Sequence, residues 1–468
     1  MKDESFRDSI GTINEDGSRN FIFPKKPKGK FYSARTYVSY LLILILFGGV
    51  FVKIDGNPLL MVNIFERKFS ILGSMFYPQD FYIFVLMMIT GIIFIVLFTV
   101  VFGRLFCGWV CPQTIMLEMV FRKIEYWIDG DRHQQMKLNK MPWNAQKATK
   151  RIGKWAIFWV LSFIVANTLL GYIIGIDALL ELVQSSPVEN FGGFSALVIF
   201  TSVFYFVFAY FREQACIIAC PYGRLQGVLL DRKSIQVSYD YVRGERDKGR
   251  SKFKKSEDRL AAGKGDCIDC NQCVEVCPTG IDIRNGSQME CVNCTACIDA
   301  CDHIMTSVKQ DTGLIRYASE ENIANGEKPT LNARIIAYSS VLVILISVVI
   351  ALLSVRSDID TTLLRLPGQL YQEEGDEISN VFTYKMINKT NYDKDVELKL
   401  ISHKGLIDLV GKNSITVKAK ERYSGTIFIR INNDDLDRTK NAVVIGVYEN
   451  GELINKVKTN FIGPMKYN

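Results

Sequence analysis

CIDCNQCVEVCP, at residues 267–278, contains four cysteines in the spacing C-x2-C-x2-C-x3-C, and a proline follows the last of them. The same spacing returns in CVNCTACIDACD, at residues 291–302, without the proline. In proteins with two 4Fe–4S clusters, three cysteines of each run bind one cluster and the fourth binds the other cluster. The two runs therefore predict a ferredoxin-like domain that holds two 4Fe–4S clusters, with its core at residues 258–310.

This crosswise rule gives each cluster four predicted ligands. Those of the first cluster are Cys267, Cys270, Cys273 and Cys301. Those of the second cluster are Cys291, Cys294, Cys297 and Cys277. Zinc sites usually show two C-x2-C pairs that a longer loop separates, and disulfides are rare in the reducing cytoplasm, so neither alternative fits the two runs. Two adjacent clusters predict a protein that carries single electrons.

Apolar residues make up 48% of the chain and are concentrated in blocks. A membrane core of about 30 Å is crossed by roughly 20 apolar residues in a helix. The blocks that predict membrane spans are Tyr37–Val52 with its flanks, Phe81–Phe102, Trp155–Ile174, Phe194–Phe211 and Ile335–Val355. The residues before the first span are polar and charged, so no cleavable signal is expected.

Lys and Arg are distributed unevenly between the connections, and this asymmetry predicts the orientation in the membrane. The tail at residues 1–35 and the connection after the second span are rich in both, whereas Gly175–Gly193 contains neither. We expect a bacterial inner-membrane protein with residues 1–35 and 212–334 in the cytoplasm. Residues 36–211 would hold spans one to four, residues 335–355 span five, and residues 356–468 a periplasmic domain. All twelve cysteines then lie on or at the edge of the reducing cytoplasmic side.

The C-terminal region contains no cysteine and is predicted to be all β. Apolar residues, many of them β-branched, alternate with polar residues or form short continuous runs in VELKLIS, SITVKAK and GTIFIRI. Glu449-Asn450-Gly451-Glu452 predicts a hairpin turn, because Asn-Gly tolerates positive φ. About seven strands in roughly 110 residues predict an immunoglobulin-like sandwich. The expected fold class is thus a multi-domain membrane protein with about five transmembrane α-helices, a cytoplasmic two-cluster ferredoxin-like domain and a C-terminal immunoglobulin-like domain.

Two further cysteine pairs share the pattern C-x3-C-P, in FCGWVCPQ at residues 106–113 and ACIIACPYG at residues 215–223. Proline favours the first position of a helix, so Cys111 and Cys220 are expected to cap helices that begin at Pro112 and Pro221. The apolar positions after residue 112 predict a lipid-facing stripe on the first of these interfacial helices. Arg104 and Arg212, just before the pairs, are expected to snorkel to lipid headgroups.

Thiolates are soft ligands that select Cu(I), zinc or iron–sulfur centres. The candidate copper ligands are Cys107, Cys111, Cys216 and Cys220. If the second and fourth spans are adjacent, these four sulfurs can converge on one site. The alternative is four reduced cysteines buried where helices pack together.

Other cofactor and partner classes find no support in the sequence. The three histidines, at residues 133, 303 and 403, lie outside the predicted spans, which excludes a bis-histidine haem within the bilayer and a histidine-built copper centre. No Walker or G-x-G-x-x-G element indicates a nucleotide. The basic linker after residue 212 is expected to be partly mobile and near anionic lipid headgroups, so no nucleic-acid partner is implied by the net charge of +7.

Together, these motifs resemble those of the cytochrome c oxidase accessory protein family, whose members are called CcoG, FixG or RdxA. The resemblance covers nearly the whole chain and rests on FCGWVCPQ, ACPYGRLQG, GDCIDCNQCVEVCPTGIDIRNG and QMECVNCTACIDACDHIM. The ferredoxin runs alone are common among redox proteins, whereas the C-x3-C-P pairs narrow the resemblance to this family and its quinol-dehydrogenase relatives.

The resemblance implies a role in maturing the cbb₃-type haem–copper oxidase, as an oxidoreductase that reduces Cu(II) and supplies Cu(I). Its partners would be the lipid bilayer, oxidase subunits or copper-assembly factors, and an electron donor that is either cytoplasmic or a quinol. Two alternatives stay open: a membrane conduit that passes quinol electrons to a periplasmic reductase, and a scaffold in which the clusters are structural.

Overall fold

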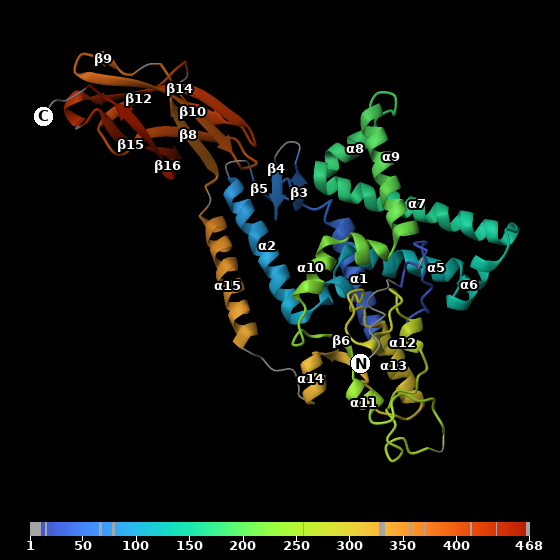
Figure 1. The fold of residues 1–468 in the computed structure, drawn as a ribbon. Helices are drawn as coiled ribbons and strands as arrows, with labels where there is room; N and C mark the ends of the chain where they lie inside the picture. Colours follow the sequence, from blue (N-terminus) through green and yellow to red (C-terminus); the bar gives the residue numbers. More distant parts are fainter. Residues whose placement is uncertain are drawn as a thin grey trace. The chain divides into compact units, whose positions relative to one another are not determined.

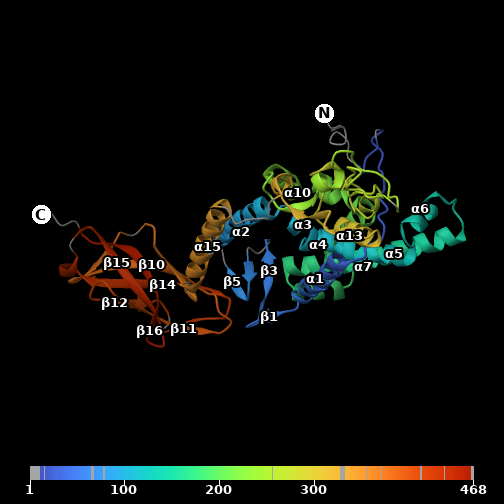
Figure 2. The same cartoon turned by 90° about the horizontal axis from the view of Figure 1, so that it is seen from below.

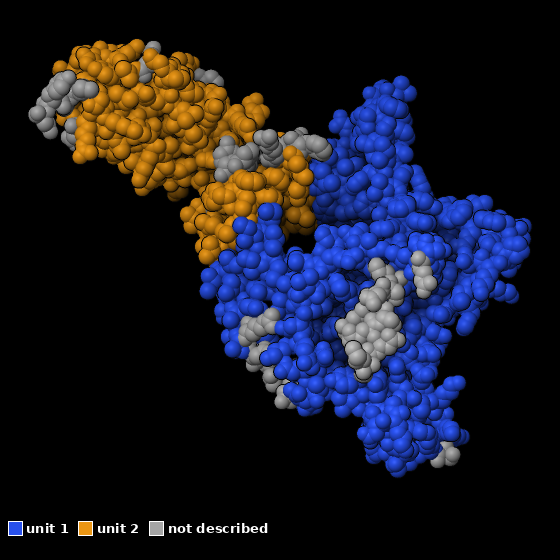
Figure 3. Space-filling view, in the orientation of Figure 1, with its two compact units in different colours: residues 1–51, 88–346 blue, residues 52–87, 347–468 orange. Residues whose placement is uncertain are grey.

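The structure is a computed structural model of the 468-residue chain. It describes residues 11–14, 16–64, 68–76, 80–255, 257–326, 333–355, 357–368, 370–411, 414–436 and 438–464. The chain divides into two compact units, coloured separately in Figure 3. Unit 1 comprises Met1–Phe51 and Met88–Ile346, and unit 2 comprises Val52–Met87 and Ser347–Asn468.

Five helices in the described residues are long and apolar enough to cross a membrane, which confirms the expected number. They are α1 (Lys30–Gly48), α2 (Phe81–Phe102), α7 (Ala145–Ile174), α9 (Phe191–Phe206) with its π-helical continuation η4 (Val207–Phe211), and α15 (Ala333–Ser354), drawn in Figure 1. Helices α1 and α7 begin earlier than predicted, because their first turns are polar and were assigned to the connections.

Further helices of unit 1 lie outside the cysteine-rich region. They are α3 (Leu105–Trp109), α4 (Pro112–Ile115), η3 (Met116–Phe121), α5 (Arg122–Ile128), α6 (Arg132–Lys140), α8 (Ile176–Gln184), η5 (Ala215–Ala219) and α10 (Pro221–Leu229). Four of them, α3, α4, η5 and α10, carry the two C-x3-C-P motifs. Segments α4, η3 and α5 follow one another directly, and η3 is a π-helical turn of the kind often found near functional sites.

The stripe that was expected to face lipid lies largely inside the protein. Ile115, Met116 and Met119 are only 2–3% exposed. Met116 packs in one cluster with Phe158 of α7 and Phe208 of η4. The prediction of a lipid-facing stripe is therefore wrong for these first turns, whereas Trp127 near the end of α5 is 79% exposed. An apolar stripe in the sequence does not distinguish lipid from neighbouring helices.

The cysteine-rich region of unit 1 extends beyond the predicted core at 258–310. It contains β6 (Gln236–Tyr239), α11 (Tyr241–Glu245), α12 (Gln272–Glu275), η6 (Ile283–Asn285), α13 (Ala296–Ser307), β7 (Ile315–Ala318) and α14 (Glu320–Asn325). Strands β6 and β7 pair antiparallel and supply Val237, Tyr239 and Ile315 to the core around the cysteines. The hydrophobic support of the site thus comes from both ends of the insert.

The first membrane helix is capped by the cysteine-rich region. Asp299 on α13 accepts hydrogen bonds from the backbone N–H groups of Phe31 (3.1 Å) and Tyr32 (2.7 Å), in the first turn of α1. Figures 1 and 2 both place α13 beside α1. A carboxylate at this end satisfies donors that the helix cannot satisfy itself and complements the helix dipole.

Unit 2 contains the predicted β domain. Its strands are β8 (Ile359–Arg365), β9 (Gln372–Glu374), β10 (Glu377–Asn388), β11 (Lys394–Leu400), β12 (Gly405–Leu409), β13 (Ile415–Val417), β14 (Arg422–Asn432), β15 (Lys440–Glu449) and β16 (Glu452–Ile462). One sheet has the order β12-β14-β10-β8 with β9 beside β10, and the other has the order β13-β11-β15-β16. Asn450 (φ 49°) and Gly451 (φ 85°) form the predicted hairpin turn between β15 and β16.

Short strands between the first two membrane helices were not predicted. They are β1 (Lys53–Ile54), β2 (Asn57–Pro58), β3 (Leu60–Asn63), β4 (Lys68–Ile71) and β5 (Ser74–Phe76). Met61 and Met75 bury their side chains against Ile387 of β10, within unit 2. Strands this short give a weak pattern, and tertiary contacts decide whether they form.

Candidate iron–sulfur and thiol sites

The structure brings the eight clustered cysteines together in two sets. Cys267, Cys270, Cys273 and Cys301 line one cavity, whose walls include the apolar residues Ile304, Met305, Leu314 and Ile315. Cys277, Cys291, Cys294 and Cys297 line a second cavity with Val237, Ile281 and Ile283, and Cys273 borders this cavity too. These are the sets that the crosswise spacing predicts, and their role as cluster ligands stays a prediction.

The two cysteine runs curve around their cavities through matching backbone turns. Asp269 and Asn271 have φ of 52° and 56°, and the equivalent Asn293 and Thr295 have φ of 53° and 65°. Left-handed backbone is tolerated by Asp and Asn but is unusual for a β-branched threonine. Strain of this kind, repeated at the same position of both runs, indicates that the loop shape serves a function.

The donor set of the second cavity fits a 4Fe–4S cluster. Asn293 is 2% exposed and borders the cavity, and its Nδ2 has no hydrogen-bond partner among the described residues. A buried amide N–H group without an acceptor is costly, and a cluster held by Cys277, Cys291, Cys294 and Cys297 would supply sulfur acceptors to this cavity. A bound cluster supplies one-electron transfer.

Burial makes these thiols dependent on a metal. Burial raises the pKa of Cys273 and of Cys291 to about 12, and that of Cys294 to about 11. Thiolate is the form that binds metal, so deprotonation in this apolar environment requires the positive charge of the metal itself. The cysteine-rich region is therefore expected to be stable only when loaded.

The two C-x3-C-P motifs adopt the same turn. The N–H of Cys111 donates to the Phe106 carbonyl and the N–H of Cys220 donates to the Ala215 carbonyl, both at 2.9 Å. Cys111 and Cys220 are the N-cap residues of α4 and α10, and a proline follows each cap. This arrangement confirms the predicted helix starts.

The four thiols of these motifs lie near one another. Burial first, and then the charges of Cys111 and Cys220, raise the pKa of Cys107 to about 12. The pKa of Cys216 is raised to the same value by burial and then by Cys111, Cys107 and Cys220. Among the described residues, no three His, Cys, Asp or Glu side chains are close enough together to bind a single metal ion, and this holds for the four thiols and for the eight cysteines around the two cavities alike. The thiols thus share one neighbourhood, and a copper site remains a prediction.

The thiol motifs pack directly on the loop of the second cavity. A Cβ on Gly108 would lie 2.6 Å from the carbonyl oxygen of Val292, so only glycine permits this approach. Cys107 and Cys216 both pack against the cluster that contains Val292 and Cys294. The thiol site and the second cysteine set are therefore adjacent parts of one structure.

Two arginines and an aromatic pair hold this junction. Arg35 donates to the Gly108 carbonyl at 2.6 Å, and Arg104 donates to the Gly223 carbonyl at 2.6 Å and to the Met289 carbonyl. Trp109, between the first two thiols, donates from Nε1 to the hydroxyl of Tyr317 at 3.0 Å. Sequence reasoning missed Arg35 and Tyr317, because their partners are distant in the chain.

The expectation that Arg104 and Arg212 snorkel to headgroups is wrong. Arg104 is 5% exposed and Arg212 is 7% exposed. Arg212 forms a bidentate pair with Glu125, with N–O distances of 2.9 and 2.7 Å. Both side chains point into the protein because buried carbonyl or carboxylate oxygens accept their hydrogen bonds.

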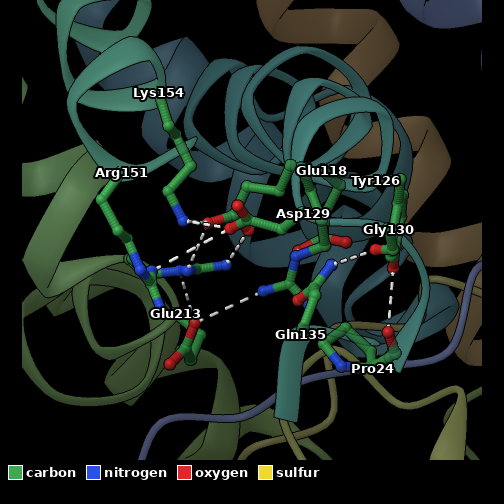
Figure 4. A network of polar contacts seen from close by, with 12 residues as sticks. Pro24, Glu118, Tyr126, Asp129, Gly130, Gln135, Arg151, Lys154 and Glu213 are labelled. Carbon is green, nitrogen blue, oxygen red and sulfur yellow. Dashed lines mark hydrogen bonds and ion pairs between the residues drawn. The ribbon is translucent and has the colours of Figure 1, made fainter. Parts of the chain in front are cut away.

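Glu125 belongs to a buried network of charges that sequence reasoning missed. Lys154 of α7 contacts Glu125 at 3.5 Å and Asp129 at 2.5 Å, and Figure 4 shows Lys154 and Arg151 directed toward Asp129. Burial opposes ionisation of Glu125, but Arg212 and Lys154 outweigh it and lower its pKa to about 2. The network ties α5 and α7 to the end of η4.

A second part of the network reaches the N-terminal tail. Glu213 contacts Arg122 of α5 at 3.4 Å and Arg19 of the tail at 3.0 Å. A sequence signal was present, because Glu118, Arg122 and Glu125 recur three or four residues apart on the segment after Cys111. The network thereby links the residues beside both thiol motifs.

Comparisons with known proteins agree with an iron–sulfur region and an immunoglobulin-like domain in this chain. Residues 211–320 match the family model described as "4Fe-4S dicluster domain", and residues 84–133 match "4Fe-4S binding domain". Residues 349–464 match "IG-like fold at C-terminal of FixG, putative oxidoreductase". With five apolar helices, these matches define a membrane iron–sulfur protein that carries an immunoglobulin-like domain.

Three relatives match over much of the chain. Protein RdxB of Cereibacter sphaeroides is 30% identical over 88% of this chain and 89% of its own, and Protein RdxA of the same species is 32% identical over 83% and 84%. Nitrogen fixation protein FixG of Rhizobium meliloti is 33% identical over 65% of this chain and 58% of its own. The chain belongs to the FixG/RdxA family of membrane 4Fe–4S proteins, and electron transfer is its general role.

Substitution of the fourth cysteine in each run tests the crosswise sets. Cys277→Ala should remove the cluster of the second cavity although Cys277 lies in the first run, and Cys301→Ala should remove the cluster of the first cavity. Iron should fall from about eight to about four atoms per chain in each variant. Electron paramagnetic resonance of anaerobic, reduced protein should show that Cys277→Ala and Cys294→Ala lose the same signal. Loss of the same signal in Cys277→Ala and Cys270→Ala would contradict the assignment.

Neutralising Glu125 tests the charge network. Glu125→Gln removes the bidentate partner of Arg212 and leaves Lys154 with Asp129 alone. Removal of one partner from a buried ion pair costs about 3–5 kcal/mol, and the remaining carboxylates keep the expected loss at or below this range. The melting temperature of the protein in detergent should fall, whereas the exposed control Glu181→Gln should melt like the original protein.

The pH dependence of this effect follows from the lowered pKa. The unfolded chain has the ordinary value of 4.5, and the folded value is about 2. The stabilisation by Glu125 should therefore be complete above pH 4.5 and decline as the pH falls toward 2. An equal loss of stability in Glu125→Gln at pH 7 and at pH 2 would contradict this role.

Proposed function

We propose that this chain is a cupric reductase that helps to assemble cbb₃-type cytochrome c oxidase. The twelve cysteines would divide into eight cluster ligands and four thiols, Cys107, Cys111, Cys216 and Cys220, that take up copper as substrate. Each Cu(II) ion accepts one electron and becomes Cu(I), which thiolates retain because both are soft. The observation that carries the proposal is the packing of Cys107 and Cys216 on the loop of the second cavity.

The exposure of the cysteines in the two sets suggests the direction in which electrons move through the protein. Cys270 of the first set is exposed, whereas Cys294 of the second set is buried and packs in the same cluster as Cys107 and Cys216. The first set would therefore receive electrons at the surface, and the second set would face the thiol site. Arg35 and Arg104 place two positive charges at this junction, where thiolates and added electrons increase the negative charge.

The membrane orientation and the partners are parts of the same proposal. The Lys and Arg asymmetry supports an inner-membrane protein with the cysteines at the cytoplasmic face and residues 356–468 in the periplasm. The immunoglobulin-like domain would then dock oxidase subunits or copper-assembly factors. The name of the FixG relative also suggests a link to nitrogen fixation.

One observation favours a second candidate function. The "4Fe-4S binding domain" match at residues 84–133 includes Cys107 and Cys111. If the four thiols hold iron, the chain would be an electron conduit from a quinol to a periplasmic reductase. Metal analysis distinguishes the two functions, because the conduit needs iron beyond the two clusters and no copper.

Removal of two thiols tests copper reduction. Anaerobic, reduced protein should lose its cluster reduction when Cu(II) is added, with one Cu(I) formed for each electron lost. Cys107→Ser combined with Cys216→Ser should retain the iron of both clusters and slow this reaction about tenfold or more. Absorbance at the cluster bands and a Cu(I) indicator provide the measurement.

The control for this variant is reduction by dithionite, which should proceed as in the original protein. A variant with full iron content that still reduces Cu(II) at the original rate would contradict a role of the thiols. If the clusters of the original protein stay reduced when Cu(II) is added, the protein is not a cupric reductase.

A further inference from the structure

An electron donor must approach the first cysteine set at the protein surface. Of the twelve cysteines, all within the described residues, Cys270 alone is exposed. Asp269 and Asn271 beside it are exposed as well. Any protein that delivers electrons here would therefore contact the residues around Cys270.

A loop is fixed beside this opening. Two of its residues donate to the carbonyl oxygen of Cys267, Ser251 from its N–H at 3.5 Å and Arg259 from Nη2 at 3.0 Å. Arg259 also donates to the Ser251 carbonyl at 3.1 Å and is 3% exposed. We call residues 248–255 and 257–260 the basic loop. These hydrogen bonds hold the loop at Ser251 and Arg259, and the expectation of a partly mobile linker stays a prediction.

The basic loop presents positive charge that the protein does not use internally. Arg243–Lys264 contains nine Lys and Arg residues and four Asp and Glu residues. Several of the cations are paired, as Lys264 is with Glu257. The cations that are exposed and form no ion pair within the described part of the chain are Lys248, Lys252, Lys254 and Lys255. Such unpaired charges beside a redox site attract a partner of opposite charge.

Apolar side chains interrupt the charge on the same loop. Phe253 is 39% exposed and Leu260 is 70% exposed. Protein interfaces combine a few apolar or aromatic contacts with a charged rim, and the charges guide the approach. Figure 1 draws the yellow-green loops after α11 at the end of unit 1 that is opposite to α8 and α9. This position favours a soluble partner over the lipid surface.

We propose that the basic loop is the docking surface for a small acidic protein that carries one electron on an iron–sulfur centre or a flavin. One electron passes from the reduced carrier to the oxidised cluster at Cys267, Cys270, Cys273 and Cys301. The carrier leaves oxidised by one electron, and no bond or proton is exchanged. The inference rests on the proposed function for its direction of electron flow, but the docking itself does not require copper.

Reversal of three loop charges tests the docking surface. Lys252→Glu, Lys254→Glu and Lys255→Glu are combined in full-length, cluster-loaded protein in lipid nanodiscs. Reduction of the clusters is followed by stopped-flow absorbance, with a prereduced acidic 2Fe–2S ferredoxin or with dithionite as donor. At low salt, the triple variant should be reduced by the ferredoxin about tenfold more slowly than the original protein, and high salt should remove the difference.

Two comparisons separate docking from damage to the cluster. Reduction by dithionite should be equal in the triple variant and the original protein. The control pair Lys137→Glu and Lys140→Glu changes exposed charges on α6 and should leave reduction by the ferredoxin unchanged. Ferredoxin binding, measured on a biosensor with immobilised nanodiscs, should weaken in the triple variant alone.

Other outcomes would overturn the inference. Equal ferredoxin reduction and binding in the triple variant would show that the loop does not dock the carrier. Weaker binding to phosphatidylglycerol vesicles by the triple variant, with unchanged ferredoxin reduction, would assign the loop to the membrane surface. If dithionite reduces no cluster in the original protein, the proposed function fails, and the ferredoxin binding measurement still decides whether the loop is a docking surface.

Discussion

The close approach of Gly108 to the carbonyl oxygen of Val292 is the constraint on which the rest of unit 1 depends. It joins a turn at the end of a membrane helix to a loop of the cysteine-rich region, which is far away in the chain. Cys107 then packs against the cluster that contains Val292 and Cys294, and Trp109 donates a hydrogen bond to Tyr317. A side chain at residue 108 would separate the two sulfur-rich parts, because its Cβ would meet the backbone carbonyl oxygens of Val292 and Asn293, which cannot move aside as a side chain can.

The buried charges give this junction a framework that apolar packing alone would not supply. Charges removed from water are favourable only with well-placed partners, so each ion of the network requires its counter-ions from other segments. The tail contributes Arg19, α5 contributes Glu125, and α7 contributes Lys154. These segments must come together to complete the network, which links the tail, α5, α7 and the residues just before the second thiol motif.

The sequence predicted the parts of the molecule that have local signals. Cysteine spacing predicted both sets of sulfurs that the cavities bring together, and apolar length predicted five helices. The Asn450-Gly451 turn followed from backbone preference at positive φ. The directions of side chains were not predicted, because the identity of an apolar or charged residue does not show whether its side chain faces lipid, water or protein. For that reason the sequence did not predict that Arg104, Arg212 and the first apolar residues after residue 112 are buried.

The cap that Asp299 provides to α1 has a consequence for biogenesis. Tyr32 is synthesised 267 residues before Asp299, so the first turn of α1 exists before the carboxylate that accepts its hydrogen bonds. The hydrogen bonds at that helix end can form only after α13 has folded and packed beside α1. The first turn of the earliest membrane segment is therefore completed by one of the later parts of unit 1.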